Sequence, residues 1–168
     1  MTTGVAAAEW IKRIVDDERR RDAVRARETE SAAQKAGLIR LNGRRLLDEL
    51  YAAVSRDAEA FREEFPGDPA RAIVVEPTDA TGGFVVRKPA SPEVTLTVTP
   101  RMEAAALTCH YRTATASGLP PREERGDLVF AGNGSEALQI RTNAGQVFAG
   151  ADALSEYLLG PVFTGRPR

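Results

Sequence analysis

The sequence is poor in cysteine and histidine, with one residue of each among 168. A single cysteine excludes an internal disulfide framework, and a chain of this length can instead be stabilised by one apolar core. No stretch approaches the ~18 consecutive apolar residues of a membrane span. The N-terminus has no basic segment followed by an apolar run, so it does not resemble a secretory signal. We therefore expect a cytoplasmic protein with no membrane partner.

An excess of charge of either sign is also missing. Lys and Arg together number 23, Asp and Glu number 24, and the first 65 residues carry 13 of each sign. Non-specific binding to nucleic acid needs a surplus of cations that neutralise phosphates. The most basic segment contains Arg19, Arg20, Arg21, Arg25 and Arg27, but acidic residues interleave with these arginines. We interpret this segment as a solvated helix face and expect no nucleic-acid partner.

Proline is absent from residues 5–65, which are rich in helix-forming residues. Gly37 and Gly43 are the only glycines there, so a kink or a break is expected in 37–43, with Asn42 as a candidate cap. One continuous helix is the alternative. We predict a polar helical arm over residues 1–36 and an α+β domain over residues 37–168.

The two halves of this helical segment differ in their apolar patterns. The second half has one stripe, which must be buried against a partner surface such as the chain's own sheet; its residues are Leu46, Leu47, Leu50, Tyr51, Val54, Ala58, Phe61 and Phe65. The first half has a patch of four, Trp10, Ile11, Ile14 and Val15, followed by a polar continuation. Leaving large apolar side chains in water costs about 1.5–3 kcal/mol each. We predict a homodimer whose interface includes Trp10 and Ile14.

The remainder of the chain has the pattern of an antiparallel sheet. Short β-rich runs separated by turn residues occupy 72–77, 82–88, 93–100, 103–113, 127–132, 136–142 and 146–150. A charged loop is expected at 117–126, tight turns at 132–134 and 143–145, and a short helix from residue 151 that ends at Gly160 and Pro161. We predict an α+β fold in which the helices cover one face of a meander of about six strands. A sheet curled around the helices as a cone with a pocket is the alternative.

The stretch "TCHYRT", residues 108–113, places the only cysteine beside the only histidine. Successive side chains of a strand point to opposite faces, so Cys109 and His110 do not form a thiolate–imidazole pair unless a bulge intervenes. We expect Cys109 on the buried face, and His110 on a polar face with Thr108 and Arg112. No spacing of zinc ligands is present, and no catalytic or metal-binding residue is predicted.

The stretch "GNGSEA", residues 132–137, matches the glycine pattern of a dinucleotide-binding loop. That chemistry requires a helix directly after the loop, because the helix N-terminus binds the pyrophosphate. A strand-like alternation follows here instead. We interpret the stretch as a hairpin turn and predict no cofactor.

Two classes of function remain. The first is a non-enzymatic interaction or oligomerisation module, indicated by the patch at residues 10–15 and by a polar sheet face. The second is a small-molecule-binding protein or an enzyme with a pocket between sheet and helix, lined by Tyr51, Phe61, Tyr111 and Phe130. The candidate contacts to a partner or ligand are Trp10, Ile14, Thr97, Thr108, His110, Arg112 and Arg141.

Overall fold

The computed structural model describes residues 3–78, 81–132 and 138–167. The chain divides into two compact units, Met1–Gly37 and Leu38–Arg168, and each is described by itself. Helix α1 (Thr3–Leu38) makes up the described part of the first unit and ends one residue beyond its boundary. The second contains a π-helical turn (Ile39–Gly43), α2 (Arg44–Glu63), β1 (Val74–Pro77), β2 (Phe84–Lys88), β3 (Glu93–Arg101), β4 (Ala106–Ala114), β5 (Arg122–Gly132), β6 (Leu138–Thr142), β7 (Val147–Phe148) and α3 (Ala151–Thr164).

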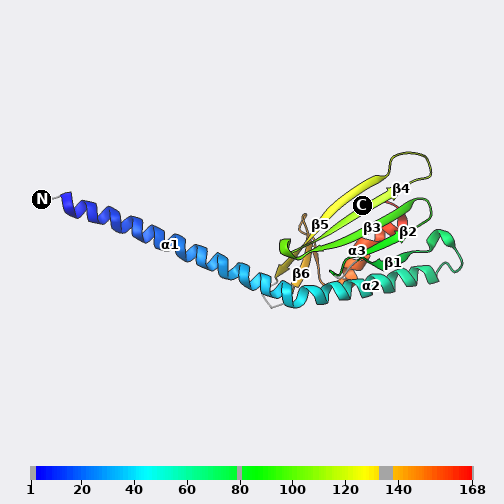
Figure 1. The fold of residues 1–168 in the computed structure, drawn as a ribbon, viewed down its shortest axis with the longest axis horizontal. Helices are drawn as coiled ribbons and strands as arrows, with labels where there is room; N and C mark the ends of the chain where they lie inside the picture. The colour runs from blue at the N-terminus through cyan, green and yellow to red at the C-terminus, as the bar shows by residue number, and fades with distance from the viewer. Residues whose placement is uncertain (1–2, 79–80, 133–137, 168) are drawn as a thin grey trace. The chain divides into compact units, whose positions relative to one another are not determined.

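The strands form one curled antiparallel sheet in the order β1 to β7, so each strand pairs with its neighbours in sequence (Figure 1). The predicted α+β fold is confirmed, with seven strands in place of about six; β7 has only two residues. Strand β5 begins at Arg122, inside the segment predicted to be a loop. The charged residues at its start pair with β4, because one face of the sheet is solvated and accepts charge in a strand. The turn predicted at 132–134 lies largely outside the described residues.

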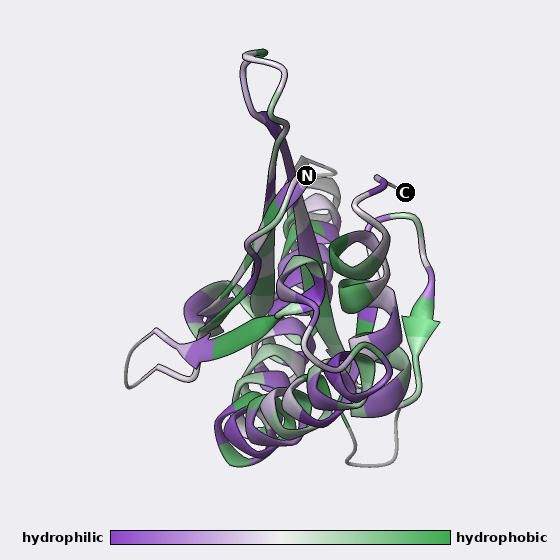
Figure 2. Cartoon of the chain, turned by 90° about the vertical axis from the view of Figure 1, so that its right-hand side faces the viewer, coloured by the Kyte–Doolittle hydropathy of each residue, from purple (hydrophilic) through white to green (hydrophobic). Residues whose placement is uncertain are grey.

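One face of the sheet forms the core together with α2 and α3. The pairs Val98–Cys109 and Leu107–Leu128 are buried on this inner face. Helices α2 and α3 supply their own apolar stripes to the same cluster, whose most buried helical residues are Leu47, Leu50, Val54, Ala58, Leu154, Leu158, Leu159 and Val162. Hydrophobic and hydrophilic residues both occur along the strands and helices, as the colours of the cartoon show (Figure 2).

The kink or break expected in 37–43 is a π-helical turn, Ile39–Gly43, over which the backbone stays helical. Leu38 and Gly43 both keep right-handed helical backbone angles, and Asn42 makes no cap. A Cβ atom at Gly43 would lie 3.5 Å from the Met102 side chain. That distance is an ordinary van der Waals contact, so the turn packs against Met102, and its Ile39 is buried in the core.

Helix α3 continues past the predicted stop at Gly160 and Pro161, to Thr164. Proline removes a backbone donor from a helix interior and normally ends it. Here the last turn is held by tertiary packing, because Val162 is fully buried and the Phe163 ring stacks on Phe61 with ring centroids 4.2 Å apart. The helix ends at Gly165, which has φ of 65°.

A polar network joins α2 to α3. The buried Ser155 hydroxyl donates to the Asp57 carboxylate at 2.7 Å. Arg56 contacts both Asp57, at 3.0 Å, and Asp152, at 2.9 Å. Burial alone would raise the pKa of Asp57, but the hydrogen bonds from Arg56 and Ser155 and the charge of Arg56 outweigh it, and the pKa is lowered. The ionised carboxylate is thus the form that the folded state favours.

The hairpin between β1 and β2 depends on glycine at residue 83. A Cβ atom there would lie 2.7 Å from the Thr78 hydroxyl oxygen and 2.9 Å from the Val98 carbonyl oxygen. The Gly83 carbonyl also accepts a hydrogen bond from the Thr78 amide at 2.9 Å. A larger residue would therefore displace backbone that the hairpin uses.

We predict that Gly83→Ala lowers the free energy of unfolding by about 1–3 kcal/mol, the usual cost of overpacking. Gly126→Ala is the control, because a Cβ atom there meets nothing within 4 Å. Urea denaturation of both variants measures the difference. Equal stability of the two variants would contradict the steric account of Gly83.

We predict that Asp57→Asn lowers stability at neutral pH by about 1 kcal/mol, because a charge-assisted hydrogen bond is replaced by a neutral one. The lowered pKa of Asp57 means that its contribution is present above its unfolded-state pKa of about 3.9 and is lost as the pH falls through the folded-state pKa. The difference between variant and wild type should therefore shrink on acidification, as measured by urea denaturation from pH 6 down to pH 2.

Asp48→Asn is the control for this measurement, since Asp48 forms an exposed pair with Arg44 on the same helix. A difference between Asp57→Asn and wild type that stays constant or grows as the pH falls would show that the network acts through packing alone.

Candidate functional site

The first candidate surface is the arm patch, which we define as Trp10, Ile11, Ile14 and Val15 of α1. Trp10 and Ile14 are one turn apart on the helix and keep 49% and 51% of their surface exposed. Beyond the patch, exposed ion pairs cover the helix: Asp17–Arg20, Glu18–Arg21 and Asp22–Arg25. The patch is therefore an isolated apolar area on a polar helix.

The second candidate surface is the solvated outer face of the sheet. The register places Thr97 opposite His110, with Thr108 and Arg112 two residues to either side of His110 on the same face. Thr108 donates to Asp127 at 3.1 Å, and the His110 Nε2 atom lies 3.6 Å from a Glu123 carboxylate oxygen.

Arg141 also lies on this outer face, but between Val129 and Val147. The structure thus brings four of the predicted contacts together on β3 and β4, namely Thr97, Thr108, His110 and Arg112. Arg141 stands apart from them, and Trp10 and Ile14 belong to the arm.

The expectation that Cys109 and His110 face opposite ways is confirmed. Cys109 is buried on the inner face, while His110 is partly exposed on the outer face. The outer-face groups interact mainly as exposed or partly exposed polar pairs, which contribute little energy. Within the described ranges, no group of three or more His, Cys, Asp or Glu residues has the spacing to hold a metal ion.

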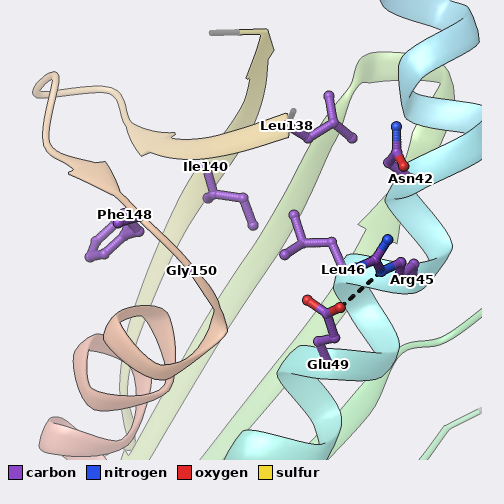
Figure 3. A pocket seen from close by; sticks show the side chains of 9 residues that line it. Asn42, Arg45, Leu46, Glu49, Leu138, Ile140, Phe148 and Gly150 are labelled. Carbon is purple, nitrogen blue, oxygen red and sulfur yellow. Dashed lines mark hydrogen bonds and ion pairs between the residues drawn. The ribbon is translucent and has the colours of Figure 1, made fainter. Parts of the chain in front are cut away.

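A cavity of about 290 Å³ lies between the start of α2 and strands β6 and β7 (Figure 3). Leu46 and Ile140 extend into it from opposite walls. An ion pair between Arg45 and Glu49, 3.0 Å long, lies on the α2 side. Both side chains of the pair are largely exposed, so their charges are solvated. The opposite wall, formed by the sheet, is apolar and consists of Leu138, Ile140 and Phe148.

A second cavity, which we name the α3 chamber, has a volume of about 300 Å³ and lies between β4, β5 and α3. Its lining comprises Cys109, Tyr111, Glu124, Arg125, Gly126, Asp127, Leu128, Thr142, Asn143, Ala144, Tyr157, Leu158 and Pro161. The Tyr111 hydroxyl donates to the Leu158 carbonyl at 2.7 Å, so this wall is fixed by a buried hydrogen bond.

The sequence prediction of a pocket between sheet and helix identified only Tyr111 among the residues that line this chamber. Phe130 is fully buried, Tyr51 packs edge-on against Phe84, and Phe61 stacks on Phe163. His110, Arg112 and Arg141 lie on the opposite face of the sheet. Gly126 is the residue in the sequence that could have indicated this chamber, since a glycine inside a strand often marks a place where another group approaches closely.

Comparison of the chain with models of protein families, with curated protein sequences and with solved structures found no match. Among the described residues, no helix combines the length and the apolar character required to cross a membrane. Arguments about function therefore depend on the geometry of the surfaces themselves.

We predict that Tyr111→Phe lowers the free energy of unfolding by about 0.5–1.5 kcal/mol, because it removes a buried hydrogen bond to the Leu158 carbonyl. His110 precedes Tyr111 in β4 but lies on the outer, solvated face of the sheet. His110→Ala should therefore change the free energy of unfolding by less than about 0.5 kcal/mol. Urea denaturation at pH 7 tests both values. A larger cost for His110→Ala than for Tyr111→Phe would contradict the assignment of faces.

Proposed function

We propose that the protein is a non-enzymatic interaction module whose helical arm associates with a second copy of the chain. The observation that carries the proposal is the arm patch: Trp10, Ile11 and Ile14 are about half exposed, and Val15 is 40% exposed. Four neighbouring apolar side chains on an otherwise charged helix favour association, because burial removes them from water. A two-fold dimer uses the same patch on both chains.

The charge of the arm supports a protein partner over an anionic surface. Residues 1–37 contain eight basic and seven acidic side chains. Basic residues are paired with acids three positions away along the helix, as in Asp17–Arg20 and Glu18–Arg21. A nucleic acid or an acidic membrane would meet almost no net charge. A second copy, in contrast, presents an apolar patch of matching size.

The cellular setting of this module is part of the proposal. A cytoplasmic location is supported by the single cysteine, which suits a reducing compartment. A bacterial source is supported only by the composition, in which arginine far outnumbers lysine and alanine is abundant.

We predict that Trp10→Asp combined with Ile14→Asp converts a dimer into a folded monomer, because four charges would enter the two-fold interface. The control is Val24→Asp combined with Ala26→Asp, which adds the same charge to α1 outside the patch. Sedimentation equilibrium at tens of micromolar measures the mass of each species, and circular dichroism confirms that the helix is retained.

Two results would refute the proposal. One is a wild-type chain that sediments at the monomer mass of 18.1 kDa at tens of micromolar. The other is dissociation of the control variant to the same extent as the patch variant, which would show that added charge, and not loss of the patch, breaks the dimer.

A further inference from the structure

The α3 chamber arises from two small residues that face each other on the inner face of the sheet. Cys109 pairs with Gly126, whereas the flanking inner-face pairs are Tyr111 with Glu124 and Leu107 with Leu128. A Cβ atom at Gly126 would meet nothing within 4 Å. The missing side chain at Gly126 therefore leaves space between larger neighbours, and that space is open to a ligand.

The walls of the chamber are apolar and preformed. Leu128, Leu158 and Pro161 contribute aliphatic surface, and Tyr111 and Tyr157 contribute rings. The Tyr111 hydroxyl is bound to the Leu158 carbonyl, and the Tyr157 ring packs on Phe148 with ring centroids 4.7 Å apart. The volume of about 300 Å³ is at the lower end for small-molecule sites. It fits a ligand with one ring and a short substituent.

The mouth of the chamber exposes backbone of β5. Strand β6 pairs with β5 only over the five residues from Leu128 to Gly132. In the described part of the chain, no strand pairs with Arg122 to Asp127 on the side away from β4. Arg125 and Asp127 line the chamber although their side chains belong to the outer face. Their backbone supplies this lining, with amide donors and carbonyl acceptors of the kind that recognise another amide.

The charged residues of the chamber lining are paired or have their side chains on the outer face. The Glu124 carboxylate is paired with the Arg122 guanidinium at 2.6 Å. Asp127 is turned to the outer face, where it accepts a hydrogen bond from Thr108. A charged ligand would lose its hydration on entry. The inner face would not compensate it, because Glu124 is already paired and the side chains of Arg125 and Asp127 belong to the outer face.

We infer that the α3 chamber is a binding site for a small, planar, uncharged ligand that carries an amide-type group. The ring occupies the space beside Gly126 and Cys109, and the amide pairs with the free backbone edge of β5. This site uses none of the arm residues, so it is independent of the proposed association of α1. Its occupancy can be tested whether or not the chain dimerises.

The test uses three ligands of nearly equal shape: benzamide, which is neutral, benzoate, which is anionic, and benzamidine, which is cationic. Benzamide at millimolar concentration should raise the melting temperature, because a ligand that binds the native state stabilises it. The two charged ligands should bind at least about tenfold more weakly. Equal or tighter binding of either charged ligand, or no binding of benzamide, would overturn the inference.

Cys109 reports on the site in the unmodified protein, since it is the only cysteine and lines the chamber. Benzamide should slow alkylation of Cys109 by iodoacetamide at least severalfold, and benzoate should not. Binding of benzamide without protection of Cys109 would place the ligand elsewhere and overturn the inference.

The variant Gly126→Leu should abolish binding of benzamide by filling the chamber. Arg112→Leu is the matched control, because it adds the same side chain to an exposed outer-face position of the neighbouring strand β4, outside the chamber lining, and should leave binding unchanged. Retention of binding by a folded Gly126→Leu variant would refute the assignment. If Gly126→Leu does not fold, protection of Cys109 in the wild type decides the question.

Discussion

Burial of a single face of one sheet is the constraint on which the domain of residues 38–168 depends. A seven-stranded meander has one apolar face, and α2 and α3 supply most of the helical residues that cover it. The two helices are joined by buried Ser155 and by Asp57, so the cover is fixed by a polar contact as well as by packing. Side chains of the core fill the inner face, so a ligand can bind there only where a side chain is absent. Gly126 is such a position, because it has no side chain.

The same constraint leaves the outer face of the sheet to the solvent. The outer face is satisfied by polar pairs such as Thr108 with Asp127, so it needs no further partner for stability. The arm patch differs, because Trp10 and Ile14 present large apolar side chains that remain about half exposed. Exposed apolar area on a polar helix is more readily explained by association than by stability of the single chain. We therefore propose that the arm binds a partner and that the domain binds a ligand.

Periodicity was sufficient to predict the fold class, the faces of β3 and β4, and the burial of Cys109, because alternation with a period of two is a strong local signal. It failed where tertiary contacts override local preference. Pro161 predicts the end of a helix, yet Phe163 and Val162 hold one more turn against the core. The charged sequence at the start of β5 is typical of a loop, yet these residues form a strand because they pair with β4. Periodicity did not predict the α3 chamber. Its walls come from segments that lie far from Gly126 in the sequence, and a local pattern cannot show that they meet in space.

The measurement that tests the central claim most directly is the fluorescence of Trp10, the only tryptophan in the chain. Emission should be recorded on dilution from about 100 µM to below 1 µM, with light scattering on the same samples. If the arm patch forms the interface, the emission maximum moves to longer wavelength as the scattering mass falls from dimer to monomer, because the indole becomes hydrated. An emission maximum typical of a fully hydrated indole at every concentration, or a fall in mass with no change in emission, would contradict the account.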